Sequence, residues 1–447
     1  MKTINSSSNL LPAKTLGIVE RLLVVEILNS VFVKKETTTS FFLNNKKELR
    51  NVKAYDLAYA NRASKQILKN LNSIDNFFSV FLKAKTEMTI LNILRLAVFQ
   101  IYFEDRQPYA CVDSAVKLTK FKFKKKHKAP GYVNAILRSV LRNQNDIDYL
   151  REKESTGFHK TKLSEHFSQI YGTAEQKKTW ESLKNDAPID LTIKDKNQID
   201  IWEKKLNGIR IANSHTIRLR NKPKISDLPG YEDGAWWVQN YSASLPVLLL
   251  RNIKNLDIVD CCAAPGGKTL QLSGGGANTT SLDISKRRAE SLRQNLKRTS
   301  LQATIIICNL LNFMPKKLVD AVLLDAPCSS TGTLRKNPEI EYLDPMSRIH
   351  FFSVLQKKML NHIRHWIRPG GRIVFSTCSL SPKEGSGIVK EFLKENKNFH
   401  VEDIDCKLIG LDNSLKDALG GLRVHPHYLS NIGGVDGFYI AVLKKQQ

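Results

Sequence analysis

The sequence predicts a multidomain protein: an all-helical N-terminal domain, then a small α+β domain, then an α/β domain with a doubly wound parallel sheet. Three observations carry this prediction. Apolar residues recur at helical spacing up to about residue 143, short apolar strands alternate with helices after residue 236, and a glycine-rich turn follows the first of those strands. Alternating strands and helices are typical of a parallel sheet covered on both faces. A length of 447 residues leaves room for two or three domains.

The N-terminal domain, residues 1–147, is predicted to be helical from its apolar periodicity. The first ten residues are rich in Ser and Asn and lack the apolar core of a signal peptide, so we expect a frayed tail there. A charged helical connector is expected over residues 148–187, with helices at 163–171 and 180–183. The clearest helices of the domain itself are expected at residues 19–28, 91–102, 112–118 and 132–142.

The small α+β domain is expected over residues 188–235. Strands are predicted at 188–194, 209–211 and 216–219, with a helix at 199–206. Lys194, Arg218 and Arg220 lie in or beside these strands. They are either contacts to a nucleic acid or ordinary surface cations, and the surface interpretation is slightly favoured.

The α/β domain is expected over residues 236–447. Its clearest helices are predicted at 286–299 and 345–366, and a terminal strand at 434–442. Five further strands are expected at residues 256–260, 279–283, 303–308, 321–325 and 371–376.

A turn rich in glycine follows the first of these strands. It reads Cys262-Ala-Ala-Pro-Gly-Gly-Lys268 and leads into a predicted helix. Glycines let the backbone approach a ligand, and the free N–H groups of a helix start bind its polar edge. Asp283 ends the second strand, where its carboxylate can accept both hydroxyls of a ribose. This pattern favours a nucleoside cofactor over a plain structural turn, although it has neither the dinucleotide nor the Walker A spacing.

Two cysteines follow later strands. Asp325-Ala-Pro-Cys328 ends one strand and Thr377-Cys378 ends another. The carboxyl ends of parallel strands share one edge of the sheet, so both thiols are expected near the cofactor and near each other. Such a pair suggests covalent catalysis by a thiolate. The alternative is two small buried hydrophobic residues, but polar neighbours at strand ends favour chemistry.

These motifs resemble those of the RsmB/NOP family of RNA cytosine-5 methyltransferases. The resemblance is carried by residues 262–268, Asp325-Ala-Pro-Cys-Ser329, Ser376-Thr-Cys-Ser379 and Asp436-Gly-Phe-Tyr439. It implies a Rossmann-like class I S-adenosylmethionine-dependent methyltransferase domain, preceded by an RRM-like subdomain. Segments at residues 94–96, 108–110 and 131–138 resemble the NusB-like RNA-binding helical domain of the same family.

The resemblance also implies roles for four residues. Cys378 would be the nucleophile that attacks C6 of cytosine, and Cys328 would aid proton removal and release of the enzyme. Asp325 would hydrogen-bond the ring near N3. Lys268 would lie near the reacting base and lower the pKa of the thiolate.

S-adenosylmethionine is the cofactor that the resemblance implies. Asn309 stands where the family has an acid, which would weaken binding without abolishing it. Ser330 stands where a glycine is usual, and Asn240 replaces an acid in a Val-Gln-Asp segment. The expected cofactor contacts are Cys262, Ala263, Ala264, Pro265, Gly266, Gly267, Lys268, Asp283, Asn309 and Asp325.

The charge balance predicts a polyanionic partner. Lys and Arg number 69 against 43 Asp and Glu, which gives a net charge of +26. A general basic bias of the proteome is the alternative. Between Phe121 and Lys128, lysines alternate with aromatic residues. The lysines can neutralise phosphates and the aromatic rings can stack on unpaired bases, but the same pattern is equally compatible with a solvated loop. By resemblance, Arg335 is expected at the RNA backbone. The cations of the loop are Lys122, Lys124, Lys125, Lys126 and Lys128.

The expected partner is 16S ribosomal RNA, free of most ribosomal proteins, as the NusB-like front end implies. Transfer RNA, 23S ribosomal RNA and a catalytically weak RNA-binding factor remain alternatives, and the chain lacks the Glu-Asn-Val motif of DNA cytosine-5 methyltransferases. Seven cysteines without regular spacing argue against a disulfide framework and a zinc motif. We therefore expect a cytoplasmic monomer without a metal or a membrane span.

Overall fold

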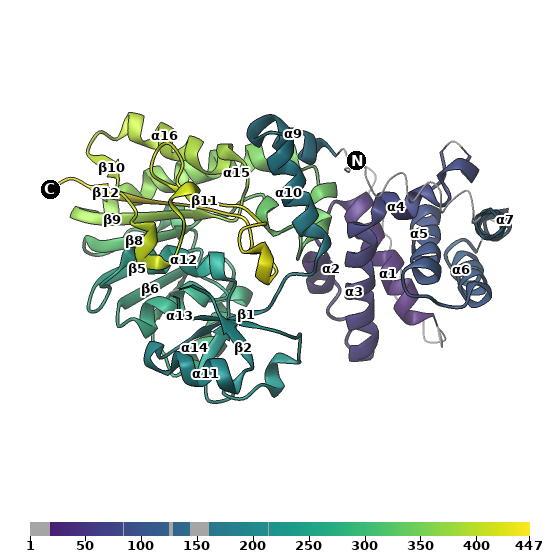
Figure 1. The fold of residues 1–447 in the computed structure, drawn as a ribbon, viewed down its shortest axis with the longest axis horizontal. Helices are drawn as coiled ribbons and strands as arrows, with labels where there is room; N and C mark the ends of the chain where they lie inside the picture. The colour runs from purple at the N-terminus through teal and green to yellow at the C-terminus, as the bar shows by residue number, and fades with distance from the viewer. Residues whose placement is uncertain (1–17, 84, 125–127, 144–160, 213) are drawn as a thin grey trace. The chain divides into compact units, whose positions relative to one another are not determined.

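The computed structural model describes residues 18–83, 85–124, 128–143, 161–212 and 214–447, and the chain divides into two compact units (Figure 1). One unit holds Met1–Ser164 with Asn337–Asp344, and the other holds Glu165–Lys336 with Pro345–Gln447. The expected frayed N-terminal tail lies outside the described residues.

The first unit is helical, as predicted. Its longest helices form because their apolar residues face one shared core, to which α1 contributes six buried side chains. The helix expected from Val112 begins earlier, at Pro108, because proline is favoured in the first turn of a helix. The helices are α1 (Val19–Asn29), α2 (Thr38–Asn44), α3 (Ala54–Lys69), α4 (Leu71–Asn76), α5 (Met88–Tyr102), α6 (Pro108–Lys122) and α7 (Lys128–Arg142).

A segment from late in the chain completes this helical unit. The 3₁₀ turn η7 (Pro338–Tyr342) places Glu339 where it accepts hydrogen bonds from the Thr38 N–H at 3.1 Å and the Thr38 hydroxyl at 2.7 Å. Tyr342 donates its hydroxyl to the Leu68 carbonyl at 2.9 Å, and Leu343 joins the helical core. The sequence analysis assigns this segment to the α/β domain, whereas the structure packs it with the helices.

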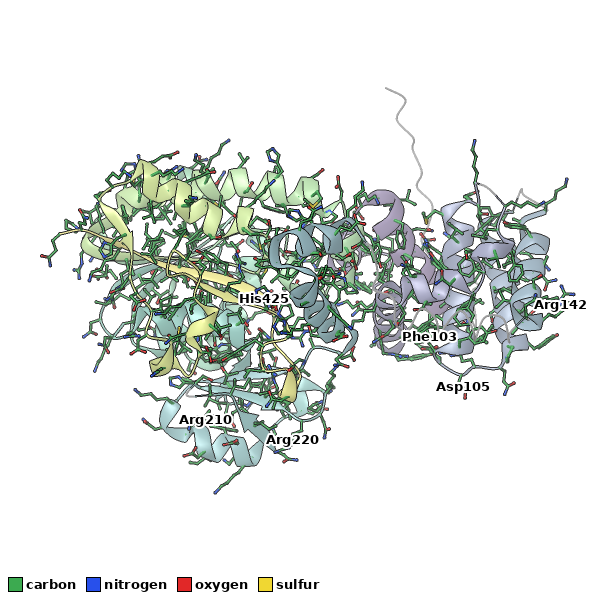
Figure 2. All side chains as sticks on the ribbon, turned by 45° about the horizontal axis from the view of Figure 1, so that its top comes forward. Phe103, Asp105, Arg142, Arg210, Arg220 and His425 are labelled. Carbon is green, nitrogen blue, oxygen red and sulfur yellow. The ribbon has the colours of Figure 1, made fainter. Side chains whose placement is uncertain are left out.

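The predicted connector helices are α9 (Lys162–Tyr171) and α10 (Thr173–Lys184). Tyr171 packs its ring against His425, 4.9 Å between ring centroids, and His427 lies 3.1 Å from the Glu175 carboxylate. His425 is labelled in Figure 2. These contacts join the end of α9 and the start of α10 to residues 425–427.

The small predicted sheet is present, with four strands in the order β2-β3-β1-β4 and all neighbours antiparallel. β4 comes from the segment that the sequence analysis assigns to the start of the α/β domain. The helix α11 (Ile199–Lys205) packs on this sheet. The strands are β1 (Asp190–Ile193), β2 (Gly208–Arg210), β3 (Thr216–Leu219) and β4 (Trp236–Val238).

Of the three cations considered in this small domain, only Arg220 is exposed (Figure 2). Arg218 is buried and pairs with Asp190 through two hydrogen bonds of 2.7 and 3.0 Å, so both interpretations from the sequence are wrong for it. Lys194 donates to the Thr299 carbonyl at 2.6 Å.

The large sheet has the order β10-β12-β9-β8-β5-β6-β7, with β11 paired to β12. Its central strands are parallel, as predicted, while β12 runs antiparallel to β9. The strands are β5 (Asp257–Cys261), β6 (Asn278–Asp283), β7 (Thr304–Ile307), β8 (Val319–Asp325), β9 (Ile367–Thr377), β10 (Phe399–Val401), β11 (Leu422–Val424) and β12 (Phe438–Lys445).

The terminal strand begins at Phe438, four residues later than predicted from Gly434. Gly434 has a φ of +71° and turns the chain, and Gly437 donates its N–H to the Gly332 carbonyl at 2.8 Å. A Cβ on Gly332 would lie 2.2 Å from the Gly437 oxygen. Two glycine backbones therefore cross here, beside the motif that contains Cys328.

Helices cover both faces of the large sheet. Successive strand residues point to opposite faces of the sheet. Ile258 packs in a core with α12 and α13, and Val259 packs in a second core with α15 and α16. The helices are α12 (Tyr241–Leu250), α13 (Gly267–Gly274), α14 (Lys286–Thr299), α15 (Pro345–Ile363) and α16 (Ser386–Glu395).

Candidate active site

The strand order reverses between β5 and β8. From β5 the sheet continues through β6 and β7 on one side, and through β8 and β9 on the other. Parallel sheets bind ligands at the carboxyl edge beside such a reversal. Apart from Arg335, each candidate site residue of the α/β domain ends one of these five strands or lies in the segment directly after it. The fold therefore gathers them at one edge.

The loop at residues 262–268 leaves β5 in a left-handed conformation. Cys262 has a φ of +60° and Gly266 a φ of +113°. A Cβ on Gly266 would lie 2.5 Å from Cδ1 of Leu292 on α14, so this position requires glycine. Thr269 donates its hydroxyl to Asp260 at 2.6 Å, which ties the first turn of α13 to β5.

Asp283 ends β6 in a fixed orientation. Its carboxylate accepts the N–H groups of Ala264 at 3.1 Å and Ser285 at 2.8 Å. Arg288, which the sequence analysis did not select, lies 2.9 Å from both carboxylate oxygens. A cation placed five residues after a strand-end acid, in the first turn of the next helix, is the signal that could have found it.

Asn309 follows β7 and caps the 3₁₀ turn η5 (Leu310–Asn312), where its side-chain oxygen accepts the Leu311 N–H at 3.1 Å. Asparagine is a favoured cap residue. The side chain is thus held at the carboxyl edge of the sheet.

Lys268 and Asp325 form an ion pair of 2.6 Å at this edge. Ser376 donates its hydroxyl to the other Asp325 oxygen at 3.0 Å, and the Lys268 ammonium lies 5.4 Å from the centre of the Phe438 ring. Asp325 balances the charge of Lys268 here, and the expected effect of the lysine on the pKa of the thiolate stays a prediction.

The two cysteines lie together, with Cys328 Sγ 3.4 Å from Cys378 Sγ and both thiols free. The hydrogen bond with Cys328 lowers the pKa of Cys378 below its ordinary value, although burial opposes it. The same hydrogen bond, together with burial, raises the pKa of Cys328 well above its ordinary value. Either thiol can donate in this contact, and the two directions favour ionisation of Cys378 over ionisation of Cys328.

Ser330 takes a left-handed conformation with a φ of +60°, which explains why glycine suits this position. Its hydroxyl lies 4.0 Å from Cys328 Sγ, and its hydrogen bond is a further cause of the lowered pKa of Cys378. The serine therefore adds a donor beside the thiolate.

The cations expected at RNA have mixed environments. Lys122 pairs with Glu26, the Lys124 ammonium lies 5.8 Å from the centre of the Phe121 ring, and Lys128 is the first residue of α7. Lys125 and Lys126 lie outside the described residues.

The expected RNA contact of Arg335 needs correction. Its side chain is only 1% exposed, donates to the Gly433 carbonyl and lies 3.8 Å from Asp436. The guanidinium fixes the segment before the terminal strand and does not face an RNA-binding surface.

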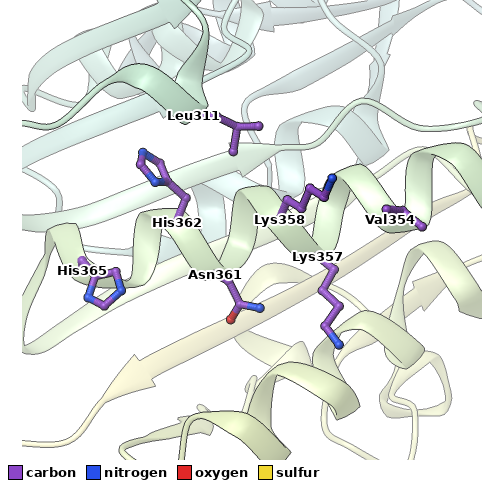
Figure 3. Close-up of a pocket in the computed structure, with 7 residues that line it drawn as sticks. All are labelled: Leu311, Val354, Lys357, Lys358, Asn361, His362 and His365. Carbon is purple, nitrogen blue, oxygen red and sulfur yellow. The ribbon is translucent and has the colours of Figure 1, made fainter.

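A surface hollow of about 670 Å³ lies along α15 (Figure 3). Lys357 there is held by Glu391 and Glu395 at 3.2 and 2.8 Å. None of the selected residues lines this hollow, which consists of Leu311, Val354, Lys357, Lys358, Asn361, His362 and His365.

Among the described residues, no helix has the length and apolarity needed to cross a membrane. Within the same ranges, no three His, Cys, Asp or Glu side chains are arranged to hold a metal ion.

Comparisons with known structures agree with this fold. The crystal structure of PH0851 aligns with a TM-score of 0.72 at 21% identity and covers 95% of this chain and 98% of that one. The structure of NSun6 from Pyrococcus horikoshii with SFG aligns with a TM-score of 0.54 at 18% identity, over 64% of this chain and 98% of that one.

Sequence comparisons go further. Residues 247–444 match the family described as 16S rRNA methyltransferase RsmB/F, and residues 19–142 match the NusB family. The ribosomal RNA small subunit methyltransferase B of Pasteurella multocida is 30% identical over 380 residues, 81% of this chain and 82% of that protein. The Vibrio vulnificus protein of the same name is 31% identical over 71% of this chain and 74% of its own length. With the paired cysteines at the strand ends, these matches establish that the chain belongs to the RsmB/F family of 16S rRNA methyltransferases.

Proposed function

We propose that this protein transfers a methyl group from S-adenosylmethionine to C5 of a cytosine in 16S ribosomal RNA, through a covalent bond between Cys378 and C6. The observation that carries the proposal is the 3.4 Å contact between Cys328 and Cys378, which lowers the pKa of Cys378. A thiolate that is stabilised by a neighbouring thiol is ready for nucleophilic attack.

The residues of the carboxyl edge fit S-adenosylmethionine. The 262–268 loop turns through Gly266 into α13, Asp283 ends the neighbouring strand β6 with its carboxylate oriented by the Ala264 N–H, and Asn309 caps the turn after β7. Asp283 would hold the ribose hydroxyls and Asn309 would accept the adenine amino group. When bound, the cofactor supplies an electrophilic methyl group on a sulfonium. Arg288 would keep the Asp283 carboxylate oriented for that contact.

Cys378 acts first in the proposed reaction. Its thiolate forms a bond to C6 of the cytosine, and the electron pair of the C5–C6 double bond becomes available at C5 for bonding to the methyl carbon. The lowered pKa raises the thiolate fraction at neutral pH. Because the target base would otherwise be stacked in RNA, it has to leave its stack to reach the thiolate.

Cys328 acts later, when the C5 proton has to leave and the bond from Cys378 to C6 has to break. The largest cause of its raised pKa is the hydrogen bond to Cys378. That acceptor disappears once Cys378 is bonded to carbon, so the pKa of Cys328 falls at that stage. The residue thereby becomes able to assist proton removal when it is needed.

Asp325 and Lys268 would orient the base. The carboxylate is held from two sides, by Lys268 at 2.6 Å and Ser376 at 3.0 Å. A hydrogen bond from Asp325 to the ring edge near N3 would favour electron flow from C6. Lys268 balances the charge of this carboxylate next to the reacting base.

The helical unit supports an RNA substrate. Residues 19–142 match the NusB family, and the chain carries a net charge of +26. We expect this unit to bind 16S ribosomal RNA, with the α/β unit performing the chemistry. The free thiol pair needs a reducing compartment, which we expect to be the cytoplasm.

The test is methyl transfer from labelled S-adenosylmethionine to naked small-subunit RNA, large-subunit RNA and transfer RNA. We expect label only in small-subunit RNA, no activity for Cys378→Ala, and an accumulated protein–RNA adduct for Cys328→Ala. Cys111→Ala, a buried cysteine of the helical unit, is the matched control and should retain activity. RNA binding without any labelled RNA would instead support a catalytically weak RNA-binding factor.

A further inference from the structure

A buried carboxylate connects the two loops that carry the cysteines. Glu384 ends the 3₁₀ turn η9 (Pro382–Glu384) and is 0% exposed. One carboxylate oxygen accepts the Ser329 N–H at 2.7 Å, and the other accepts the Ser379 hydroxyl at 2.6 Å. The Ser329 hydroxyl also donates to Glu384. Ser329 directly follows Cys328, and Ser379 directly follows Cys378.

The backbone and a neighbouring helix extend this connection. Thr377, the residue before Cys378, donates its hydroxyl to the Glu384 carbonyl at 2.8 Å. Gln356 on α15 donates to the Pro327 carbonyl at 2.8 Å, and the same amide lies 3.4 Å from Glu384. The residues on either side of each cysteine are thus held by Glu384 and Gln356, whereas the sulfur atoms contact each other and Ser330.

We propose that Glu384 is a positioning residue that keeps the two cysteine loops in register, so that Cys328 Sγ stays within hydrogen-bonding distance of Cys378 Sγ. The inference rests on the proposed function for its catalytic meaning, but the geometry holds without it. A buried carboxylate is costly unless it is hydrogen-bonded, and the donors that satisfy Glu384 come from both loops. Burial raises its pKa, and the hydrogen bonds from Ser329 and Ser379 oppose that rise.

A positioning role and a direct electrostatic role of Glu384 predict thiol pKa changes of opposite sign when the residue is replaced. The charge of Glu384 raises the pKa of Cys328, so removal of the charge alone would make thiol ionisation easier. Loss of register would do the opposite at Cys378, because the hydrogen bond from Cys328 is the largest cause of its lowered pKa. The other groups that act on Cys378 are Ser330, which lowers its pKa, and Asp325 and Asp436, which raise it.

The experiment measures the rate of iodoacetamide alkylation at Cys378 against pH in the full chain, by mass spectrometry of the peptide, without RNA. Glu384→Met removes the acceptors at similar volume, and Glu384→Gln keeps one acceptor. We expect the alkylation midpoint of Glu384→Met to rise by about one pH unit, the size of one hydrogen-bond contribution. Glu384→Gln should shift it less. Glu391→Gln, an exposed glutamate of α16, is the matched control and should not shift it.

Catalysis provides the second measurement. If the protein methylates RNA as proposed, kcat of Glu384→Met should fall at least tenfold while KM for RNA and for S-adenosylmethionine stay unchanged. A midpoint that stays in place or falls, in a variant whose far-ultraviolet circular dichroism matches the wild type, overturns the proposal. If Glu384→Met does not fold, Ser329→Ala is decisive instead, because it removes one donor and should raise the midpoint by a smaller amount. Since alkylation needs no RNA, an inactive wild-type enzyme would count against the proposed function alone.

Discussion

Two carboxylate–cation pairs in the second unit differ in how completely they are enclosed. Asp190 and Arg218 in the small sheet are 0% and 3% exposed at their side chains, whereas Asp325 and Lys268 at the strand ends are 32% and 10% exposed. Asp190 also accepts the Tyr241 N–H at 3.0 Å, and Arg218 also donates to the Ile432 carbonyl at 2.8 Å. The first pair has its bonding capacity filled by protein, and the second leaves part of its carboxylate open to another molecule.

The difference separates a structural ion pair from one suited to chemistry. Asp190 and Arg218 join the small sheet to α12 and to the turn before the terminal strand, so their role is to hold elements together. Asp325 has two fixed donors and an accessible edge, which is what a group that binds a base requires. A variant at Asp190 or Arg218 should therefore reduce mainly stability. A variant at Asp325 or Lys268 should reduce mainly activity.

The largest expected effect is on stability, from Arg218→Ala. The variant leaves Asp190 buried without its partner, which costs about 3–5 kcal/mol. This loss corresponds to a fall in the melting temperature of about 10 °C for a unit of this size. Thermal unfolding followed by circular dichroism measures it. Arg220→Ala removes the exposed neighbour two residues away and should melt like the wild type.

The second expected effect is on activity, from Asp325→Asn. The amide keeps the shape but loses the charge that Lys268 and the substrate would use, so methylation should fall by about 100–1000-fold. Stability should change by less than about 1 kcal/mol, because the side chain is partly exposed. Initial rates and melting curves measure the two quantities. Asp257→Asn, at the start of β5 where Lys317 pairs with it, is the control and should retain activity. Equal losses of stability in Asp325→Asn and Arg218→Ala would remove the distinction between the pairs.

The same comparison shows what the sequence could predict. α14 matches its predicted bounds from Lys286 to Thr299, and the strand-end residues follow their strands as expected, because local apolar periodicity determines both. The conformation of Ser330 and the pairing of Lys268 with Asp325 depend on neighbours that a motif does not specify.

Partners distant in sequence explain the remaining differences. Arg218 and Arg335 were expected at a surface or at RNA, yet both are buried with acids 28 and 101 residues away along the chain. The segment at 337–344 packs with the helical unit because Glu339 and Tyr342 find Thr38 and Leu68 there. No local pattern in one sequence reveals which distant residue will satisfy a charge.

A third prediction adds a carboxylate beside the enclosed pair. Asn240 donates to Asp190 at 3.3 Å and accepts the N–H groups of Ser242 and Asp436. In Asn240→Asp the introduced carboxylate would face Asp190, and the repulsion raises the folded-state pKa of the introduced carboxyl above its unfolded value. The stability is then retained at low pH and lost as pH rises through the folded-state pKa.

We expect a destabilisation of about 1–2 kcal/mol at pH 8 that shrinks towards pH 5. Urea unfolding at both pH values measures it. Asn221→Asp, an exposed site that follows β3 of the small sheet by two residues, is the control for adding an acid to the same domain. A loss of stability that is the same at both pH values would show that the introduced carboxyl is not repelled by Asp190.

The smallest expected effect concerns Ser330, at the open site. Ser330→Gly relieves the left-handed conformation of a residue with a side chain, so stability should rise by at most about 1 kcal/mol. Loss of the hydroxyl removes a hydrogen bond that lowers the pKa of Cys378, so the acid limb of the alkylation profile at Cys378 should move to higher pH by a few tenths of a unit, roughly a fraction of one hydrogen bond. Ser330→Ala separates the two effects, because it loses the hydroxyl but keeps the Cβ. It should show the same shift in pH without the gain in melting temperature, and an unchanged alkylation midpoint in both variants would exclude the serine from activation of the thiolate.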